Sequence, residues 1–255
     1  MRNWRLAVLI LALSAAVASA VPYTVPIAED TFVRAATPTS NYGSAQPGMG
    51  ALAVSGLTSV NGSGAPVGRV DTFIKFGLAS LFPTLDADFP GGWQIESIAL
   101  RVEEQSNPNN ALYAYGPVGG GTFDINWIPD DTWSETTLTW NTAAGFLDDP
   151  MQLLVDEFPT IGRQPVNTFV EHFCDLPLAG SFYDDLLDGN PVSLYLTTQD
   201  TDEGFQFASS NNLTPARRAY VLLDVAAASA VPEPASLGLV AIGLVAMVRR
   251  RRGRW

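Results

Sequence analysis

Hydrophobic residues alternate with other residues in one short segment after another along residues 21–230, and this two-residue period constrains the fold more than any other feature of the chain. Successive side chains of a β-strand point to opposite faces, so each segment is expected to be a strand with one buried and one solvent-facing side. The clearest segments are residues 70–76, 98–102, 192–198, 205–207 and 219–225.

Clusters of glycine and proline separate these segments and favour tight turns between strands. They lie at residues 61–64, 89–92, 119–121 and 188–191. Only residues 181–187 have the pattern of a short helix, with Asp188-Gly189 as its stop. Many short strands without helical crossovers predict an all-β fold, an antiparallel β-sandwich of jelly-roll type. The lack of an internal repeat or mid-chain linker predicts that residues 21–230 form one domain.

Residues 1–20 contain the three parts of a secretory signal peptide. Arg2 and Arg5 form a short positive region, residues 6–13 are apolar, and Ala18-Ser19-Ala20 is a small-residue cleavage site. We therefore expect export through the Sec machinery and cleavage at the site marked by Ala18 and Ala20. A first transmembrane helix is the alternative, and the short apolar run disfavours it.

The C-terminus, residues 231–255, also has three parts. Pro232-Glu233-Pro234 precedes a charge-free run at residues 235–248, and arginines dominate residues 249–255. A helix over the apolar run would be about 21 Å long, against a hydrocarbon core of about 30 Å. The sequence therefore predicts a short C-terminal transmembrane helix with only transient membrane insertion. The arginines should stay cytoplasmic, which places the body of the chain on the other side.

These three parts in this order resemble the PEP-CTERM sorting signal of Gram-negative bacteria. The resemblance implies recognition by an exosortase-type processing enzyme and removal of the tail. It also implies delivery from the inner membrane to the cell surface or extracellular matrix. The alternative is an ordinary tail anchor with incidental prolines.

Three segments of the body resemble the DNRLRE family of bacterial secreted β-sandwich modules. They are residues 29–34 with Asn41-Tyr42-Gly43, residues 73–78 with 95–102, and the tryptophan segment 133–141. The resemblance implies a β-sandwich domain over residues 21–230. Some relatives are described as carbohydrate-binding modules, and many are accessory parts of polysaccharide-degrading enzymes or surface proteins. Polysaccharide binding is therefore a further expectation, although the Gly/Ser-rich insertion near residues 56–68 departs from the family pattern.

The body of the chain is strongly acidic. Residues 21–230 hold 7 basic and 25 acidic residues, a formal net charge of −18. Nucleic acids and anionic lipid surfaces bind basic patches, so the composition argues against both as partners. It also disfavours uronic-acid polymers, unless calcium bridges them or arginines cluster locally; the candidates are Arg34, Arg69, Arg101 and Arg163.

Sugar binding requires aromatic rings on which a pyranose face can stack. The candidate rings are Trp93, Tyr113, Tyr115 and Trp127. Trp133 and Trp140 belong to the tryptophan segment, and we interpret them as core or turn packing, where large aromatic residues usually lie.

Calcium is the metal that the sequence favours, because it prefers clustered oxygen ligands from loops. Asp200, Asp202 and Glu203 provide such carboxylates at alternating spacing, and residues 124–131 form a second acidic region. Neither region has the spacing of an EF-hand loop.

Sequence signals for catalysis are few. His172 and Cys174 are the single histidine and cysteine, and on a strand both would face one side. We expect them to pack, since a zinc site would lack ligands and one cysteine forms no internal disulfide. Acidic doublets such as Asp130-Asp131, Asp148-Asp149 and Asp184-Asp185 could hydrolyse glycans only by facing each other across a cleft. The expected function is therefore a non-enzymatic surface or matrix protein; the alternative is a secreted glycan-degrading hydrolase or lyase.

Overall fold

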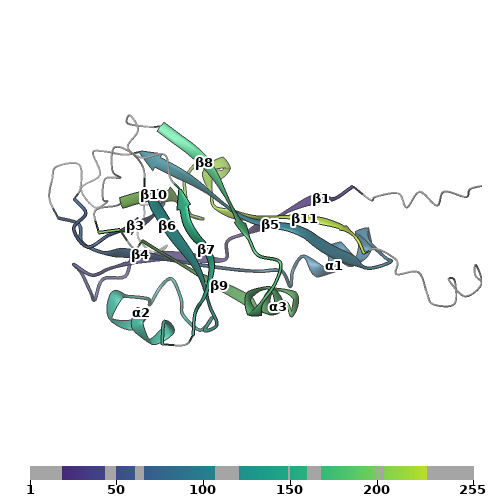
Figure 1. Cartoon of the computed structure of the whole chain (residues 1–255), viewed down its shortest axis with the longest axis horizontal. Helices are drawn as coiled ribbons and strands as arrows, with labels where there is room; N and C mark the ends of the chain where they lie inside the picture. Colours follow the sequence, from purple (N-terminus) through teal and green to yellow (C-terminus); the bar gives the residue numbers. More distant parts are fainter. Residues whose placement is uncertain are drawn as a thin grey trace, which may run out of the picture.

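The computed structural model describes residues 19–43, 50–60, 66–106, 121–148, 150–159, 168–198, 200–201 and 204–228 (Figure 1). Within these ranges the strands are β1 (Val21–Pro26), β2 (Glu29–Arg34), β3 (Ala51–Ser55), β4 (Val70–Gly77), β5 (Trp93–Ser106), β6 (Thr122–Ile128), β7 (Gln152–Pro159), β8 (Thr168–Leu176), β9 (Pro191–Thr197), β10 (Gly204–Ala208) and β11 (Tyr220–Ala227). The helices are α1 (Phe82–Asp88), α2 (Trp140–Phe146), α3 (Ser181–Leu187) and the 3-10 turn η1 (Pro215–Arg217).

The strands form one antiparallel sheet in the order β1-β11-β5-β10-β3-β4-β9-β6-β7, with β2 paired to β4 and β8 paired to β5. The long strand β5 pairs with other strands on both of its edges. Its Arg101 lies opposite Tyr220 on β11 and opposite Phe173 on β8. The sheet curls, so that the Phe158 ring on β7 lies 5.7 Å from the His172 ring on β8. The expectation of a mostly β, antiparallel fold is thus confirmed, and the β-sandwich of jelly-roll type remains a prediction.

The main hydrophobic core lies inside the curl and follows the predicted alternation. Ile98, Leu100 and Val102 on β5 are buried there, as are the alternate residues of β9 and β11. Those of β9 and β11 are Val192, Leu194, Leu196, Val221, Leu223 and Val225. Burial of these side chains is the main favourable contribution to folding, about 1.5–3 kcal/mol for each large aliphatic residue.

The opposite face of β4 and β9 is also buried, whereas the alternation predicts that it faces solvent. Every residue of β4 from Val70 to Phe76 is buried. The reason is that α2 and the preceding residues 129–139 pack across this face and form a second cluster with it. The cluster consists of Val33, Phe73, Ile128, Trp133, Leu138, Ala143 and Tyr195.

Helix α3 occupies residues 181–187, as the sequence predicts. Gly189 follows it with a φ of 78°, a conformation that favours glycine and ends the helix. Helices α1 and α2 were not expected from the alternation. Their local start signals are a proline in the first turn of α1 and a bond from the Thr139 backbone N–H to the Thr142 hydroxyl (3.0 Å) at α2.

The first and last strands pair with each other, from Val21 opposite Val225 to Pro26 opposite Tyr220. The start of β1 and the end of β11 therefore lie side by side, at the right of Figure 1, whereas α2 lies toward the left. In the part of the chain that the structure describes, no helix is long and apolar enough to span a membrane. The predicted transmembrane residues 235–248 lie outside that part.

Candidate functional site

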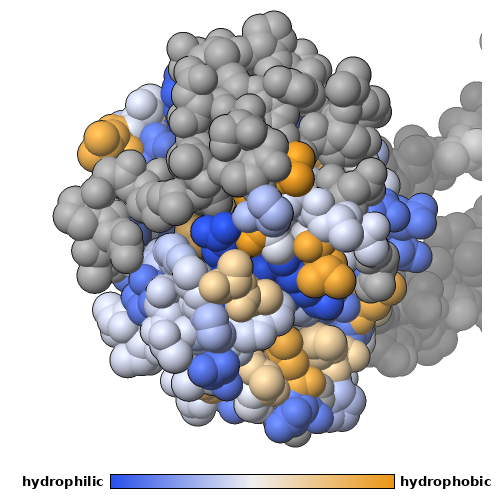
Figure 2. Space-filling model, turned by 90° about the vertical axis from the view of Figure 1, so that its left-hand side faces the viewer, coloured by the Kyte–Doolittle hydropathy of each residue, from blue (hydrophilic) through white to orange (hydrophobic). Residues whose placement is uncertain are grey.

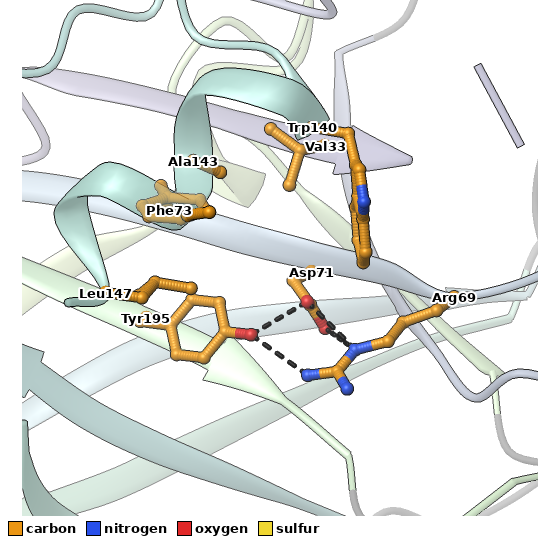
Figure 3. Close-up of a pocket in the computed structure, with 9 residues that line it drawn as sticks. Val33, Arg69, Asp71, Phe73, Trp140, Ala143, Leu147 and Tyr195 are labelled. Atoms are coloured by element: carbon orange, nitrogen blue, oxygen red, sulfur yellow. Dashed lines mark hydrogen bonds and ion pairs between the residues drawn. The ribbon is translucent and has the colours of Figure 1, made fainter. Parts of the chain in front are cut away.

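A cavity of about 230 Å³ lies between α2 and the outer face of the sheet (Figure 3). Strands β2, β4 and β9 supply one side, α2 with the residue after it supplies the other, and Arg69 precedes β4. The lining residues are Val33, Arg69, Asp71, Phe73, Trp140, Ala143, Ala144, Leu147 and Tyr195. The cavity therefore combines apolar walls with one group of hydrogen-bonding side chains.

The polar side of the cavity is a network around the buried carboxylate of Asp71. The Nε of Arg69 donates to both carboxylate oxygens, at 3.2 and 3.0 Å. The Tyr195 hydroxyl donates to Oδ2 at 2.7 Å and the Thr197 hydroxyl to Oδ1 at 2.9 Å. The Nη2 of Arg69 donates in turn to both hydroxyls at 3.1 Å. Four donor contacts occupy the acceptor capacity of a carboxylate.

Burial sets the electrostatics of this network. It raises the pKa of Asp71, because desolvation outweighs the opposing effects of Arg69 and the two hydroxyl donors. Burial and the neighbouring Asp71 carboxylate together raise the pKa of Tyr195, so its hydroxyl stays protonated. The network is thus a fixed structure with a neutral phenol and an ion pair.

The groups left open to a ligand are the outer edge of the guanidinium and the Trp140 ring. The Nη1 of Arg69 has no partner among the described residues, and this side chain is 43% exposed. Trp140 is half-buried, and Figure 3 shows its ring extending from α2 toward Asp71 and Arg69. The cavity can therefore offer N–H donors and an aromatic face.

Lys75 anchors the tryptophan segment, residues 133–141, to the sheet. This segment includes the start of α2, so the anchor also helps to position the helix. Lys75 donates to the Glu29 carboxylate at 2.9 Å and to the Trp133 carbonyl, and its ammonium lies 4.4 Å from the centre of the Trp133 ring. The Trp133 indole donates to the Ser193 hydroxyl at 2.9 Å. Trp133 is 2% exposed, which agrees with its interpretation as a core residue.

The Asn41-Tyr42-Gly43 turn supports the same segment from the side. The Asn41 amide donates to the carbonyls of Glu135 at 2.8 Å and Leu138 at 2.7 Å. Tyr42 stacks on Phe32 at 4.5 Å between ring centres. Two of the sequence motifs that resemble the DNRLRE modules are thus in direct contact, and together they hold α2 over the cavity.

Two of the four predicted sugar-binding aromatic residues, Trp93 and Trp127, are described, and neither lines the cavity. Trp127 is 8% exposed and packs in the main core, so its ring is not a surface platform. Trp93 is half-buried beside Phe82 and donates to Asp86 at 3.0 Å. Tyr113 and Tyr115 lie outside the described residues.

The predicted calcium ligands are only partly described. Asp200 is exposed, and Asp202 and Glu203 lie outside the described residues. Within the described ranges, no group of three or more His, Cys, Asp or Glu side chains could hold a metal ion. Calcium binding by this loop remains a prediction.

His172 and Cys174 both point into the main core, as their spacing on one strand predicts. The His172 Nε2 lies 2.8 Å from Oε2 of Glu104, and burial strongly raises the pKa of the Cys174 thiol. Neither residue lines the cavity. Their position agrees with packing roles.

Sequence reasoning did not find the cavity. Asp71 lies on an alternating strand, where an acidic residue normally faces solvent, and Trp140 was interpreted as packing. The available signal was the pairing of an acidic residue with Arg69 two positions earlier, which places both on one face of an extended segment. Nothing local indicates that α2 covers this face.

Hydrophobic side chains on the end of the molecule that is at the left in Figure 1 form small groups between hydrophilic ones (Figure 2). The most exposed large hydrophobic residues of the described chain are Leu213, at 88%, and Leu57, at 68%. Scattered exposure of this kind is normal for a protein surface. The described surface visible in Figure 2 therefore shows no broad apolar face.

Comparison with known proteins identifies the C-terminal region. The PEP-CTERM protein-sorting motif matches residues 230–252, which include Pro232-Glu233-Pro234 and the apolar run. No curated protein matches the chain. The motif implies export, membrane-associated sorting and recognition by an exosortase-type processing enzyme. The chain thus carries the C-terminal sorting signal of extracellular and cell-surface proteins.

Proposed function

We propose that this protein is a non-enzymatic component of the bacterial cell surface or extracellular matrix that binds polysaccharide. Its sorting motif supports the location, with Sec export through residues 1–20 and exosortase-type removal of residues 231–255. The resemblance of residues 21–230 to DNRLRE β-sandwich modules supports a binding role. The body would then be a jelly-roll domain whose ligand site lies on its outer face.

The observation that carries the binding proposal is the Trp140 ring beside the network of Arg69, Asp71 and Tyr195. Binding pockets typically combine apolar walls with a few fixed polar groups that orient the ligand. A sugar matches this combination, because a pyranose has an apolar face of C–H groups and a rim of hydroxyls. Trp140 can stack on the face while the guanidinium edge donates to the rim.

The alternative of a hydrolase or lyase requires more than the cavity provides. Glycoside hydrolysis commonly uses two carboxyl groups about 5–10 Å apart across the substrate. The described lining contains one carboxylate, Asp71, whose oxygens already accept four donor contacts. A carboxylate held in this way orients its neighbours and is poorly placed to exchange a proton with substrate.

A glycan array probed with the full chain in mild detergent tests this proposal, with and without calcium. We expect binding to a subset of glycans that Trp140→Ala weakens by about tenfold or more, the value of one lost aromatic contact. The matched control is Phe173→Ala, which removes an exposed aromatic ring on β8 and should leave binding unchanged. Unchanged binding by Trp140→Ala would overturn the site, and release of reducing sugar during incubation would favour the enzyme.

A further inference from the structure

We infer that the cavity selects a single neutral sugar ring at the end of a glycan chain. This inference rests on the proposed function, whose site it narrows to one class of ligand. Three features of the cavity carry it: its size, its balance of charge and the hydrogen-bonding groups that remain open.

The size of the cavity suits a ligand of one ring. At about 230 Å³ it is smaller than the roughly 300–1,000 Å³ of pockets that enclose drug-sized molecules. The sheet face with Val33 and Phe73 lies on one side, and α2 with Ala143 lies on the other (Figure 3). An internal ring would have to continue out of this narrow space at both of its linkages, so a terminal ring fits better.

The charge balance disfavours an acidic sugar. The lining holds one cation, Arg69, and one anion, Asp71, which are paired at 3.0 Å. A ligand carboxylate that reached the guanidinium would lie close to the buried Asp71 carboxylate, and like charges at that distance repel. The formal charge of −18 over residues 21–230 adds a long-range repulsion of anions. A neutral ring avoids both costs.

The open hydrogen-bonding groups also match a neutral sugar. The acceptor capacity of Asp71 is occupied, and the Tyr195 hydroxyl already donates to Asp71 and accepts from Arg69. The guanidinium edge at Nη1 is left as a donor for ligand oxygens. Sugar hydroxyl and ring oxygens accept such bonds without carrying charge. Because Asp71 and Tyr195 are each 3% exposed, the guanidinium is held in place before the ligand arrives.

The test is competition on the full chain in detergent, using immobilised glycans that bind in the array. The soluble competitors are the neutral sugars glucose, galactose, mannose and N-acetylglucosamine. Glucuronic acid is the negatively charged control for glucose. We expect one or more neutral monosaccharides to compete in about the millimolar range, as suits so small a ligand. Glucuronic acid should compete at least about tenfold less well, and raising the salt from 50 to 500 mM should change neutral binding little.

Ala144→Phe is a second variant that does not remove any packing contact of the core. Ala144 is an exposed residue of α2 that lines the cavity, so a larger side chain should fill the space and abolish glycan binding while the protein stays folded. Ala216→Phe, at an exposed position of η1, is the matched control and should bind normally.

The outcomes separate this inference from the proposed function. Glycan binding that depends on Trp140, but that no monosaccharide inhibits, overturns the terminal-ring inference and leaves the polysaccharide-binding proposal standing. Preferential inhibition by glucuronic acid overturns the choice of a neutral ring. Absence of binding to any glycan contradicts both.

Discussion

Three aspartates that are buried or half-buried make the stability of this acidic chain depend on pH. Asp30, Asp71 and Asp131 all have pKa values raised by burial. Each carboxylate loses hydration, and only part of that cost is offset by hydrogen bonds or a neighbouring cation. The contribution of each group to stability therefore depends on pH.

Asp30 gives the clearest pH prediction. Burial raises its pKa from 3.8 to about 6, although the Ser210 backbone N–H donates to it. Its contribution to stability is full below pH 3.8 and is lost as the pH rises through about 6, a difference of about 3 kcal/mol. We expect the free energy of unfolding to be higher at pH 4 than at pH 7.

Asp30→Asn should remove this part of the pH dependence, because an amide keeps an acceptor for Ser210 and does not titrate. Urea unfolding at pH 4, 5.5 and 7 measures the effect. The control is Asp156→Asn, an exposed position on β7. Equal pH profiles for wild type and Asp30→Asn would contradict the assignment.

His172 and Cys174 are expected to matter for stability and not for ligand binding. Cys174→Ser places a hydroxyl in the main core and should lower the free energy of unfolding by about 1–3 kcal/mol. His172→Gln should cost less, since an amide can still donate to Glu104. Denaturation and glycan binding, measured on the same samples, check both expectations. Loss of a glycan-degrading activity in either folded variant would instead support the enzyme alternative.

The burial of a single residue was predictable from the sequence where the alternation of its strand alone decides which face the side chain occupies. Trp127 shares its strand face with Phe123 and Ile125, so its burial could have been foreseen from the sequence. The position of Trp140 could not, because it depends on the packing of α2 against β2, β4 and β9, which are all distant from it in sequence.

At the scale of elements, the tryptophan segment and the Asn41-Tyr42-Gly43 turn act as one unit that positions α2. Gly43 lies so close to the tryptophan segment that a Cβ built there would be 1.8 Å from the Glu135 carbonyl oxygen. The backbone must move to accept any side chain. The contact explains why a residue without a side chain stands at the end of this turn.

Gly43→Ala should therefore destabilise the fold by about 1–3 kcal/mol and weaken ligand binding by displacing α2. Gly91→Ala is the matched control, because a Cβ there meets nothing within 4 Å. Its effect should stay within about 0.5 kcal/mol. Thermal unfolding and glycan binding of the two variants measure the difference, and equal effects would show that the close contact is unimportant.

The strands and α3 were predictable because their signals are local: alternation for strands and Asp188-Gly189 for the helix end. The covered outer face of β4 was not. The alternation in β4 predicts a strand with only one buried face. The residues that bury its other face, 129–146, are distant from β4 in sequence. Covering of this kind depends on long-range packing, which a periodic pattern does not encode.

At the scale of the whole molecule, the sorting motif predicts a shorter mature chain. We expect mass spectrometry of the protein recovered from the cell surface to find a chain that begins at Val21 and lacks residues 249–255. Glu233→Ala should leave the tail in place, with the protein retained in the membrane fraction. Intact residues 249–255 on surface material would contradict the prediction.

The pairing of β1 with β11 has a consequence for how the protein is presented. Because Val21 lies opposite Val225, neighbouring strands bring the chain's entry into the body and its exit to within about 5 Å of each other. A chain attached to the membrane through residues 1–20, through residues 231–255 or through both is therefore attached at one end of its body. Helix α2, which lines the cavity, lies toward the opposite end of the molecule (Figure 1). Under the proposed function, the glycan site would then lie toward the end of the body opposite to the attached termini.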